Sequence, residues 1–125
     1  MPYEIKVEGT FAAAHALRGY GGPCERLHGH NFKVTAVARA ERLDEVGIAL
    51  DFKVFSSHLG EVLELLDHRN LNELPAFDKR NATAENVAAF VYEQLAPRLE
   101  STGAELSRVT VEESSKYAAS FIPER

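Results

Sequence analysis

The stretch Cys24-Glu25-Arg26-Leu27-His28-Gly29-His30-Asn31-Phe32-Lys33-Val34-Thr35-Ala36 combines a strand pattern with a cluster of metal-binding residue types. Every second residue from His28 onward is either histidine or apolar: His28, His30, Phe32, Val34 and Ala36. Alternate side chains of a β-strand leave the same face of the sheet. The stretch therefore predicts a strand that runs from about residue 28 or 31 to residue 39. On this strand both histidines share a face with the apolar side chains.

A second alternating stretch precedes it. Residues 3–13 predict a strand because the apolar side chains Tyr3, Ile5, Val7 and Phe11 alternate with polar ones, and His15 continues the apolar parity. Two such strands could direct three imidazoles at one place. Three histidines with no fourth protein ligand leave an open coordination position, which is typical of catalytic zinc. We therefore expect a metal site at His15, His28 and His30, with zinc inferred from the ligand type.

The middle of the chain predicts two helices. Asp51 is suited to cap a helix over about residues 52–66, whose apolar residues recur at steps of three and four. Thr83 is suited to cap the second helix, and Pro97 should end or kink it because proline lacks the amide donor that a helix interior needs. A loop dense in glycine and proline is predicted for residues 14–27.

Two more alternating strands are predicted at residues 106–113 and 116–122, with a tight turn around Ser114-Ser115. The order strand, strand, helix, helix, strand, strand (ββααββ) indicates an α+β fold. We expect a four-stranded antiparallel sheet with both helices on one face. Such an open sheet has two edges that a soluble protein must cover or pair, so we also expect a homo-oligomer.

Length and composition restrict the class of protein. A chain of 125 residues with 45% hydrophobic residues fits a single domain over residues 1–125. The net charge of -5 argues against a nucleic-acid partner and mildly against an acidic membrane surface. No apolar run has the length of a membrane span, and the first residues lack the apolar core of a signal peptide. A single cysteine cannot form an internal disulfide, which favours a reducing, cytoplasmic location.

Cys24 is the first candidate for chemistry beside the metal. Free cysteine is usually a small buried hydrophobic residue, but this one lies in a breaker-rich loop four residues before His28. A nearby cation would lower the pKa of a thiol and supply thiolate. We favour a catalytic role, while a role as fourth metal ligand stays open.

Two carboxylates are further candidates. Asp67 precedes His68 where a helix gives way to a loop, and an aspartate can fix the tautomer of a histidine and raise its basicity. A simple helix-terminal histidine is an equal reading of this pair. Glu113 continues the apolar parity of Val109 and Val111, where a carboxylate is costly without a partner. It could bind a guanidine-like ligand edge, or the strand could end there in solvent.

Taken together, the short motifs resemble the family of 6-pyruvoyl tetrahydropterin synthase and 6-carboxy-5,6,7,8-tetrahydropterin synthase, nearly end to end. The motifs that carry the resemblance are Phe11-Ala12-Ala13-Ala14-His15, Cys24-x-x-x-His28-Gly29-His30, Asp51-Phe52, Leu66-Asp67-His68-x-x-Leu71-Asn72, Thr83-x-Glu85-Asn86 and Val111-Glu112-Glu113-Ser114. The resemblance implies the tunnelling fold (T-fold), in which subunits associate through their sheet edges, usually as two trimers forming a hexamer.

The resemblance also implies roles for single residues. His15, His28 and His30 correspond to the zinc ligands, and Cys24 to the thiol that moves a side-chain proton. Asp67 and His68 correspond to a proton-relay pair, Glu113 to the carboxylate that anchors the pterin ring, and Thr83 to a pterin-contacting threonine. The implied substrate is 7,8-dihydroneopterin triphosphate, and the family's site lies between subunits.

The branches of the family differ in product. Three residues between Cys24 and His28 resemble the bacterial queuosine-pathway enzymes, which form 6-carboxy-5,6,7,8-tetrahydropterin and release triphosphate and acetaldehyde. Glu25 also matches the glutamate of a folate-type branch that forms 6-hydroxymethyl-7,8-dihydropterin, although it can equally be a solvated loop residue. Animal-type 6-pyruvoyl synthases have a longer gap at this point. Outside the enzymes, a metal-binding or pterin-binding protein is the remaining alternative.

Overall fold

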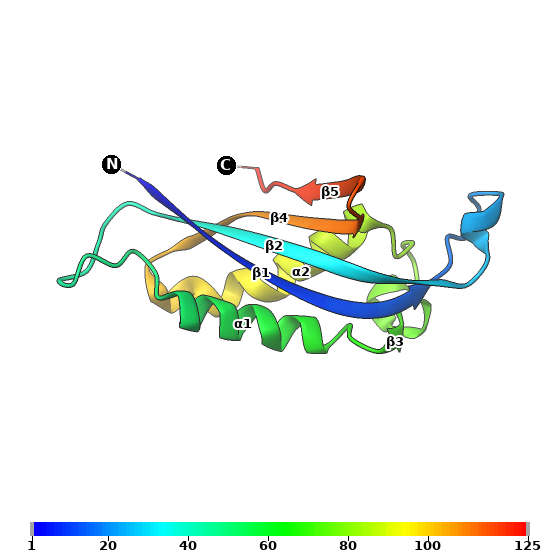
Figure 1. The fold of residues 1–125 in the computed structure, drawn as a ribbon, viewed down its shortest axis with the longest axis horizontal. Coiled ribbons are helices and arrows are strands. Elements are labelled where there is room, and N and C mark those ends of the chain that lie inside the picture. Colours follow the sequence, from blue (N-terminus) through cyan, green and yellow to red (C-terminus); the bar gives the residue numbers. More distant parts are fainter. Residues whose placement is uncertain (1, 125) are drawn as a thin grey trace.

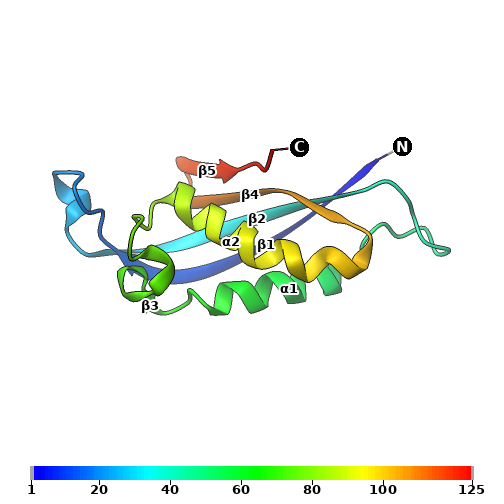
Figure 2. The same ribbon diagram turned by 180° about the vertical axis from the view of Figure 1, so that it is seen from behind.

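The structure, a computed structural model, describes residues 2–124 and shows a single twisted sheet with two helices packed on one of its faces (Figures 1 and 2). In chain order the elements are β1 (Tyr3–His15), β2 (His28–Ala40), α1 (Phe52–Glu64), β3 (Arg69–Asn70), α2 (Ala84–Leu99), β4 (Glu105–Ser114) and β5 (Tyr117–Phe121). Short 3₁₀ turns lie at Pro23–Glu25, Leu71–Glu73, Pro75–Phe77 and Glu100–Thr102. The predicted α+β fold and the ββααββ order of the main elements are thus observed.

The sheet has five strands in the order β3-β1-β2-β4-β5, so the prediction of four antiparallel strands was wrong in one respect. The additional strand, β3, has two residues and pairs in parallel with Ala13 and Ala14 of β1. Two residues are too few to show alternation in a sequence. The position of β3 depends on contacts with β1, such as the hydrogen bond of 2.6 Å from the His68 amide to the Ala12 carbonyl.

The long hairpin of β1 and β2 determines where the histidines lie. The two strands pair antiparallel over their full length, and this register places His15 opposite His28 and Ala13 opposite His30. Strand β1 continues to His15, two residues beyond the predicted end. On the helix-facing side the row continues inward into the core, where the rings of Phe11 and Phe32 stack with centroids 4.7 Å apart.

Both helices cover the same face as predicted and bury the apolar side chains of β1, β2 and β4. Helix α1 comes very close to β1 at Gly9, where a Cβ atom would lie 2.7 Å from Leu63 Cδ1. Glycine therefore permits the close contact of helix and strand at this point. Strands β4 and β5 differ from the predicted bounds by one residue at each end, and the turn between them is at Ser115-Lys116.

The predicted caps are observed, but of the two effects predicted for Pro97, an end or a kink of the helix, the end is not observed. Thr83 Oγ1 accepts a hydrogen bond of 3.1 Å from the Asn86 amide at the start of α2. Pro97 does not end this helix, which continues to Leu99. Proline removes one hydrogen bond within the last turn, whereas Leu95 and Leu99 are fully buried and hold that turn against the core. Helix α1 ends at Glu64, two residues earlier than predicted.

Loss of the α1 cap should destabilise the fold measurably. The Asp51 carboxylate accepts hydrogen bonds from the amides of Lys53 (2.7 Å) and Val54 (3.4 Å). We expect Asp51→Ala to lower the free energy of unfolding by about 1 kcal/mol, because the first-turn amides lose their acceptor. Asp51→Asn keeps an acceptor oxygen and serves as the control. Urea unfolding followed by circular dichroism measures both, and equal midpoints for Asp51→Ala and wild type would contradict the prediction.

Among residues 2–124, no helix has the length and apolar character that crossing a membrane requires.

Candidate metal centre and active site

The three histidines predicted as metal ligands lie together at the end of the β1–β2 hairpin, on the helix-facing side. One ligand nitrogen from each of His15, His28 and His30 lies within 4.8 Å of the other two. The ring centroids are 4.5 Å apart for His15 and His28, 4.9 Å for His28 and His30, and 5.1 Å for His15 and His30. The antiparallel register brings about this convergence, because His15 lies directly opposite His28 and two residues from His30 in the pairing.

Backbone carbonyls orient two of the rings. Nδ1 of His15 lies 2.6 Å from the Ala82 carbonyl oxygen, and Nδ1 of His28 lies 2.7 Å from that of Arg26. A carbonyl oxygen can only accept, so each Nδ1 carries the proton and each Nε2 keeps a free lone pair. This is the tautomer in which a histidine binds a metal through Nε2.

The inner nitrogens fit a cation better than they fit an empty core. His15 Nε2 and His30 Nε2 are buried, and neither has a hydrogen-bond partner among the described residues. Such groups are costly unless something satisfies them. Burial is also the main cause that lowers the pKa of His15, and it keeps the ring in the neutral form that a metal requires. The donor set and its two unsatisfied nitrogens therefore fit a divalent metal ion.

Glu113 lies beside the histidine cluster. Its carboxylate oxygens are 3.9 Å from His15 Nε2 and 3.8 Å from His30 Nε2. The pairing of β4 with β5 shifts register between Glu112 and Ser114, so Glu113 lies at a bulge, where a strand bends and can redirect a side chain. The carboxylate that the sequence placed on the core-facing row thus faces the metal centre, where its negative charge favours a cation.

A hollow of about 490 Å³ connects this carboxylate with the candidate thiol. Cys24, Thr83 and Glu113 all line it, together with Leu17, Arg18, Gly19, Tyr20, Asn81, Ala84, Glu85, Tyr117, Ala118 and Ala119. Cys24 is half-buried in the turn Pro23–Glu25, whereas its neighbour Glu25 is exposed. The structure therefore brings three of the predicted residues to one cavity, and Glu113 connects that cavity with the histidines.

Asp67 and His68 lie in a different place. Asp67 Oδ2 is 2.9 Å from His68 Nδ1, as expected for a pair that fixes a tautomer, but the His68 side chain is 82% exposed. His68 lines a shallow hollow with Ala12, Ala13, Ala14, Gly29, His30, Asn31 and Arg69. By strand alternation Ala12, Ala14, Gly29 and Asn31 point to the opposite face of β1 and β2 from the histidine side chains, whereas Ala13 and His30 have the parity of the cluster. Within one chain, the relay pair and Cys24 do not share a cavity among the described residues.

The Asp67-His68 pair is nevertheless held firmly. The Ala12 amide donates to Asp67 Oδ1 at 2.8 Å, and the His68 amide donates back to the Ala12 carbonyl at 2.6 Å. The Ala12 hydrogen bond, followed by contacts with His68, lowers the pKa of the Asp67 carboxyl, so it is ionised at neutral pH. His68 has a φ of 59°, a left-handed conformation that non-glycine residues adopt mainly where the surroundings enforce it.

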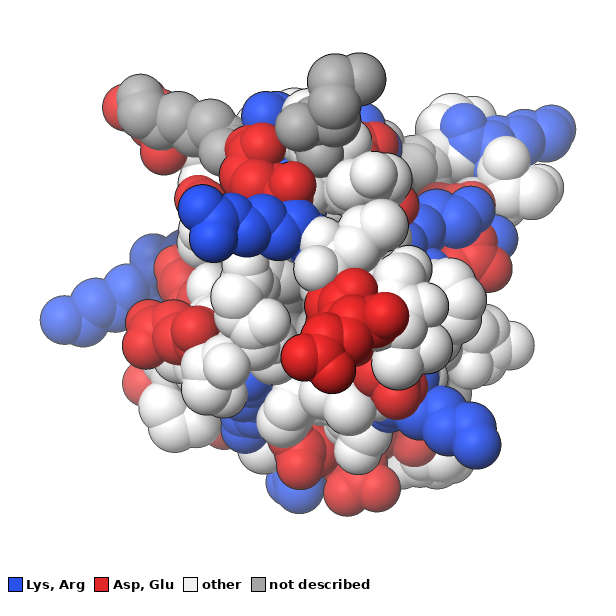
Figure 3. All heavy atoms as spheres, turned by 90° about the vertical axis from the view of Figure 1, so that its left-hand side faces the viewer, with Lys and Arg blue, Asp and Glu red and all other residues white. Residues whose placement is uncertain are grey.

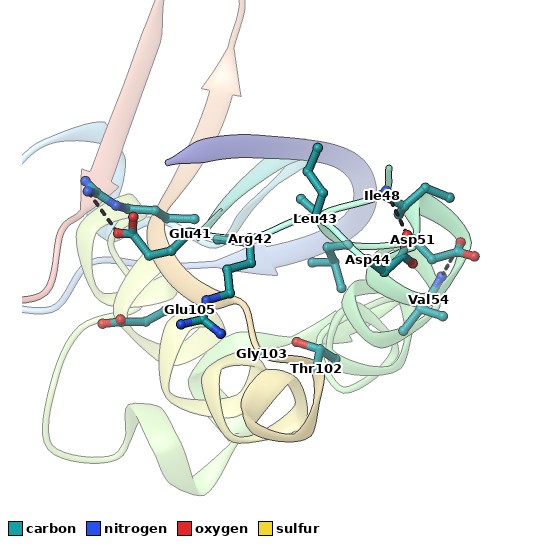
Figure 4. A pocket seen from close by; sticks show the side chains of 14 residues that line it. Glu41, Arg42, Leu43, Asp44, Ile48, Asp51, Val54, Thr102, Gly103 and Glu105 are labelled. Carbon is teal, nitrogen blue, oxygen red and sulfur yellow. Dashed lines mark hydrogen bonds and ion pairs between the residues drawn. The ribbon is translucent and has the colours of Figure 1, made fainter. Parts of the chain in front are cut away.

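A larger hollow, of about 650 Å³, lies at the opposite end of the sheet (Figure 4). Several of its polar side chains have structural partners: Arg39 pairs with Glu41, Asp44 binds the amides of its own loop, and Asp51 caps α1. Acidic and basic residues alternate with uncharged ones over this end, with no extended patch of one sign (Figure 3). The candidate active site is therefore the histidine end, where the possible metal ligands, Cys24 and Glu113 lie.

Sequence reasoning assigned no role to two asparagines that lie beside the site. The side chains of Asn72 and Asn81 bind the backbone of the segment between His15 and the Cys24 loop. The available signal was weak, because asparagine is common in loops and these two are far from residue 16 in the chain.

The fold and site together define an α+β protein with a three-histidine cluster that could hold a metal ion, beside a cavity lined in part by Cys24. The sequence model of the family described as 6-pyruvoyl tetrahydropterin synthase matches residues 4–124, and the chain belongs to this family. It is thus a lyase-type enzyme of the tetrahydropterin synthase kind, which is what the motifs predicted.

Individual proteins of known sequence or structure are similar to this chain over most of its length. The chain is 35% identical over 96 residues to the 6-carboxy-5,6,7,8-tetrahydropterin synthase of Synechocystis, covering 73% of each chain. It is 31% identical over 117 residues to the dihydroneopterin monophosphate aldolase of Pyrococcus furiosus, covering 94% of this chain and 95% of the relative. The solved 6-pyruvoyl tetrahydropterin synthase of Caenorhabditis elegans superposes with a TM-score of 0.90 at 26% identity, over 99% of this chain and 97% of that one.

Proposed function

We propose that this protein is a zinc-dependent lyase that converts 7,8-dihydroneopterin triphosphate to 6-carboxy-5,6,7,8-tetrahydropterin, with release of triphosphate and acetaldehyde. The observation that carries the proposal is the buried three-histidine cluster next to a cavity lined by Cys24 and Glu113. Three imidazoles, with no fourth histidine or cysteine grouped with them among residues 2–124, leave room for substrate oxygens. The Synechocystis relative, named for this product, supports the choice of reaction.

In this proposal His15, His28 and His30 hold the zinc ion through their side-chain nitrogens. A bound zinc ion would act as a Lewis acid that polarises the oxygens of the substrate side chain and acidifies the neighbouring C–H. His15 keeps its orientation through Ala82, and His28 through Arg26, so the ligand nitrogens are pre-aligned. This alignment limits the rearrangement needed when the metal and substrate bind.

The protein groups around the ion have separate tasks. Cys24, as thiolate, accepts the proton from the acidified carbon. Glu113 holds the pterin ring through its amino and amide edge, and Thr83 contacts the ring from the start of α2. The half-buried position of Cys24 in the same cavity as Glu113 supports this division of roles. Holding the ring fixes the substrate side chain near the thiol.

His68, oriented by Asp67, exchanges a proton with a side-chain oxygen of the substrate. Because His68 is exposed and lines no cavity with Cys24 among the described residues of a single chain, we propose that it acts in the site of a neighbouring subunit. Residues 67–70 occupy the β1 edge at Ala12 to Ala14, so its part from Tyr3 to Phe11 and the outer edge of β5 remain available for pairing. We propose that subunits pair through these edges to form a trimer, and that two trimers form a hexamer.

An alternative product is 6-hydroxymethyl-7,8-dihydropterin, formed with Glu25 in place of Cys24 as the acting residue. The similarity to a dihydroneopterin monophosphate aldolase is the observation that favours it. Glu25 is exposed on the turn, whereas Cys24 is half-buried and lines the cavity with Glu113, which supports the carboxy product. The non-enzyme alternative, a metal-binding or pterin-binding protein, would require Cys24 to complete the metal shell.

The test is a product assay. The zinc-loaded protein is incubated with 7,8-dihydroneopterin triphosphate, and the pterin products are identified by mass spectrometry. We expect 6-carboxy-5,6,7,8-tetrahydropterin together with acetaldehyde, and an unchanged product from Glu25→Ala. Formation of 6-hydroxymethyl-7,8-dihydropterin that disappears in Glu25→Ala would transfer the assignment to the alternative branch. Absence of turnover from protein with zinc bound would leave the binding-protein alternative.

A further inference from the structure

The segment Ala16–Arg18 connects the metal ligand His15 to the loop of Cys24, and neighbouring groups bind each of its three residues. Asn72 binds Ala16 twice, accepting from its amide at 2.8 Å and donating to its carbonyl at 2.8 Å. Asn81 binds Arg18 in the same way, with both distances 2.9 Å. Between them, the Leu17 amide donates to the carbonyl oxygen of Cys24 at 2.8 Å.

This pattern continues β1 beyond its last sheet residue. The backbone groups of alternate residues in a strand point to opposite edges, and here residues 16 and 18 bind on one edge while residue 17 binds on the other. A side-chain amide offers one carbonyl and an N–H donor, as a peptide unit does. Asn72 and Asn81 therefore take the place of a partner strand beyond β3, and the Cys24 carbonyl lies on the β2 side.

We propose that Asn72 is a positioning residue that fixes Cys24 relative to the three-histidine centre. Its two hydrogen bonds with the Ala16 backbone form a clasp, and the two bonds of Asn81 with the Arg18 backbone form a second clasp on the same segment. The inference rests on the proposed function in giving proton transfer to Cys24. Asn72 holds Ala16, and the extended segment that follows presents the Leu17 amide to the Cys24 backbone. Loss of the Asn72 hydrogen bonds would free the backbone of Ala16, while Arg18 stays bound to Asn81, and would loosen the contact of the Leu17 amide with the Cys24 carbonyl.

Two features distinguish a role of Asn72 in positioning Cys24 from a role in binding substrate or in holding the metal ligand His15. Of the two asparagines, only Asn81 is among the residues that line the Cys24 cavity, so Asn72 is not placed to contact substrate there. The metal ligand next to the clasp has its own support, because His15 is 1% exposed and binds Ala82 through Nδ1. A change at Asn72 should therefore act on the position of the thiol more than on the metal or the ring of the substrate.

The test uses full-length, zinc-loaded Asn72→Ala with three readouts: steady-state kinetics, bound zinc, and the rate at which iodoacetamide alkylates Cys24, the only cysteine of the chain. We expect kcat to fall by about 10² because a displacement of about 1 Å has that effect on proton transfer, with KM within about threefold of wild type. Zinc content should be unchanged, and alkylation should be about tenfold faster. Asn72→Asp keeps the acceptor for Ala16 and should give intermediate values.

Asp51→Ala, which removes a helix cap at the other end of the molecule, is the control and should leave kcat and alkylation at wild-type values. Wild-type kcat and alkylation in both Asn72 variants would overturn the proposal, as would loss of zinc or a defect confined to KM. Alkylation needs no substrate. If Asn72→Ala is alkylated faster but the wild-type protein shows no turnover, the proposed function is overturned and the positioning role of Asn72 is supported.

Discussion

We expect His28→Ala to abolish both metal binding and turnover, which is the largest effect predicted for this protein. His28 supplies one of three nitrogens that lie within 4.8 Å of one another, and two remaining imidazoles hold zinc poorly. We expect less than about a tenth of the wild-type zinc after dialysis. We also expect kcat/KM to fall by well over the roughly 10–100-fold that is seen when a residue hydrogen-bonded to a metal ligand is substituted. Elemental analysis and the product assay measure the two effects on the same sample.

His28 suits this test better than His15 because it is half-buried, so its loss leaves a smaller defect in the core. His58→Ala is the matched control. His58 lies on α1, where its Nδ1 is 3.0 Å from Glu61, and it has no contact with the cluster among the described residues. Retention of one zinc ion per chain by His28→Ala would show that the metal binds elsewhere.

Cys24→Ala should stop turnover and leave the zinc in place. If the thiolate transfers the proton, its removal should lower kcat by about 10²–10⁴, the usual contribution of a general acid or base. Cys24 lies in the cavity wall and is not one of the three grouped histidines that could hold the metal. Zinc content should therefore stay at the wild-type value. Stopped-time product assays and elemental analysis on one preparation compare the two.

Loss of zinc from Cys24→Ala would instead make the thiol a fourth ligand, close the coordination shell and favour the binding-protein alternative. Glu25→Ala is the matched control, since Glu25 is the next residue of the same turn and is exposed. It should keep both zinc and turnover. A loss of turnover in Glu25→Ala alone would favour the hydroxymethyl product.

The sequence was most informative where chemistry and periodicity coincide. The parity of His15, His28 and His30 with the apolar residues of two strands predicted that they share a face, and the register of β1 with β2 brings them together. The caps at Asp51 and Thr83 were equally readable because the capping contact spans only three or four residues. Motif order across the chain identified the family, which the match to residues 4–124 shows.

Other features could not be read from local pattern. Strand β3 is too short to alternate, and Pro97 lies within α2 because buried leucines of that helix oppose its local preference. No local pattern in the sequence indicated that Asp67-His68 is separate from Cys24 within one chain, although the family resemblance implied a site between subunits. The separation follows from the hydrogen bonds that Ala12 makes with residues 67 and 68, more than fifty positions away.

By itself, then, the sequence determined the α+β order, the face that carries the three histidines, and the family, because each depends on the spacing of nearby residues or on motif order. Only the tertiary structure decided that Glu113 faces the histidines from a bulge, that Asp67 and His68 line no cavity with Cys24 among the described residues, and that asparagine amides extend the sheet. These features depend on contacts between segments far apart in the chain, whose relative positions are fixed only when the whole core has packed.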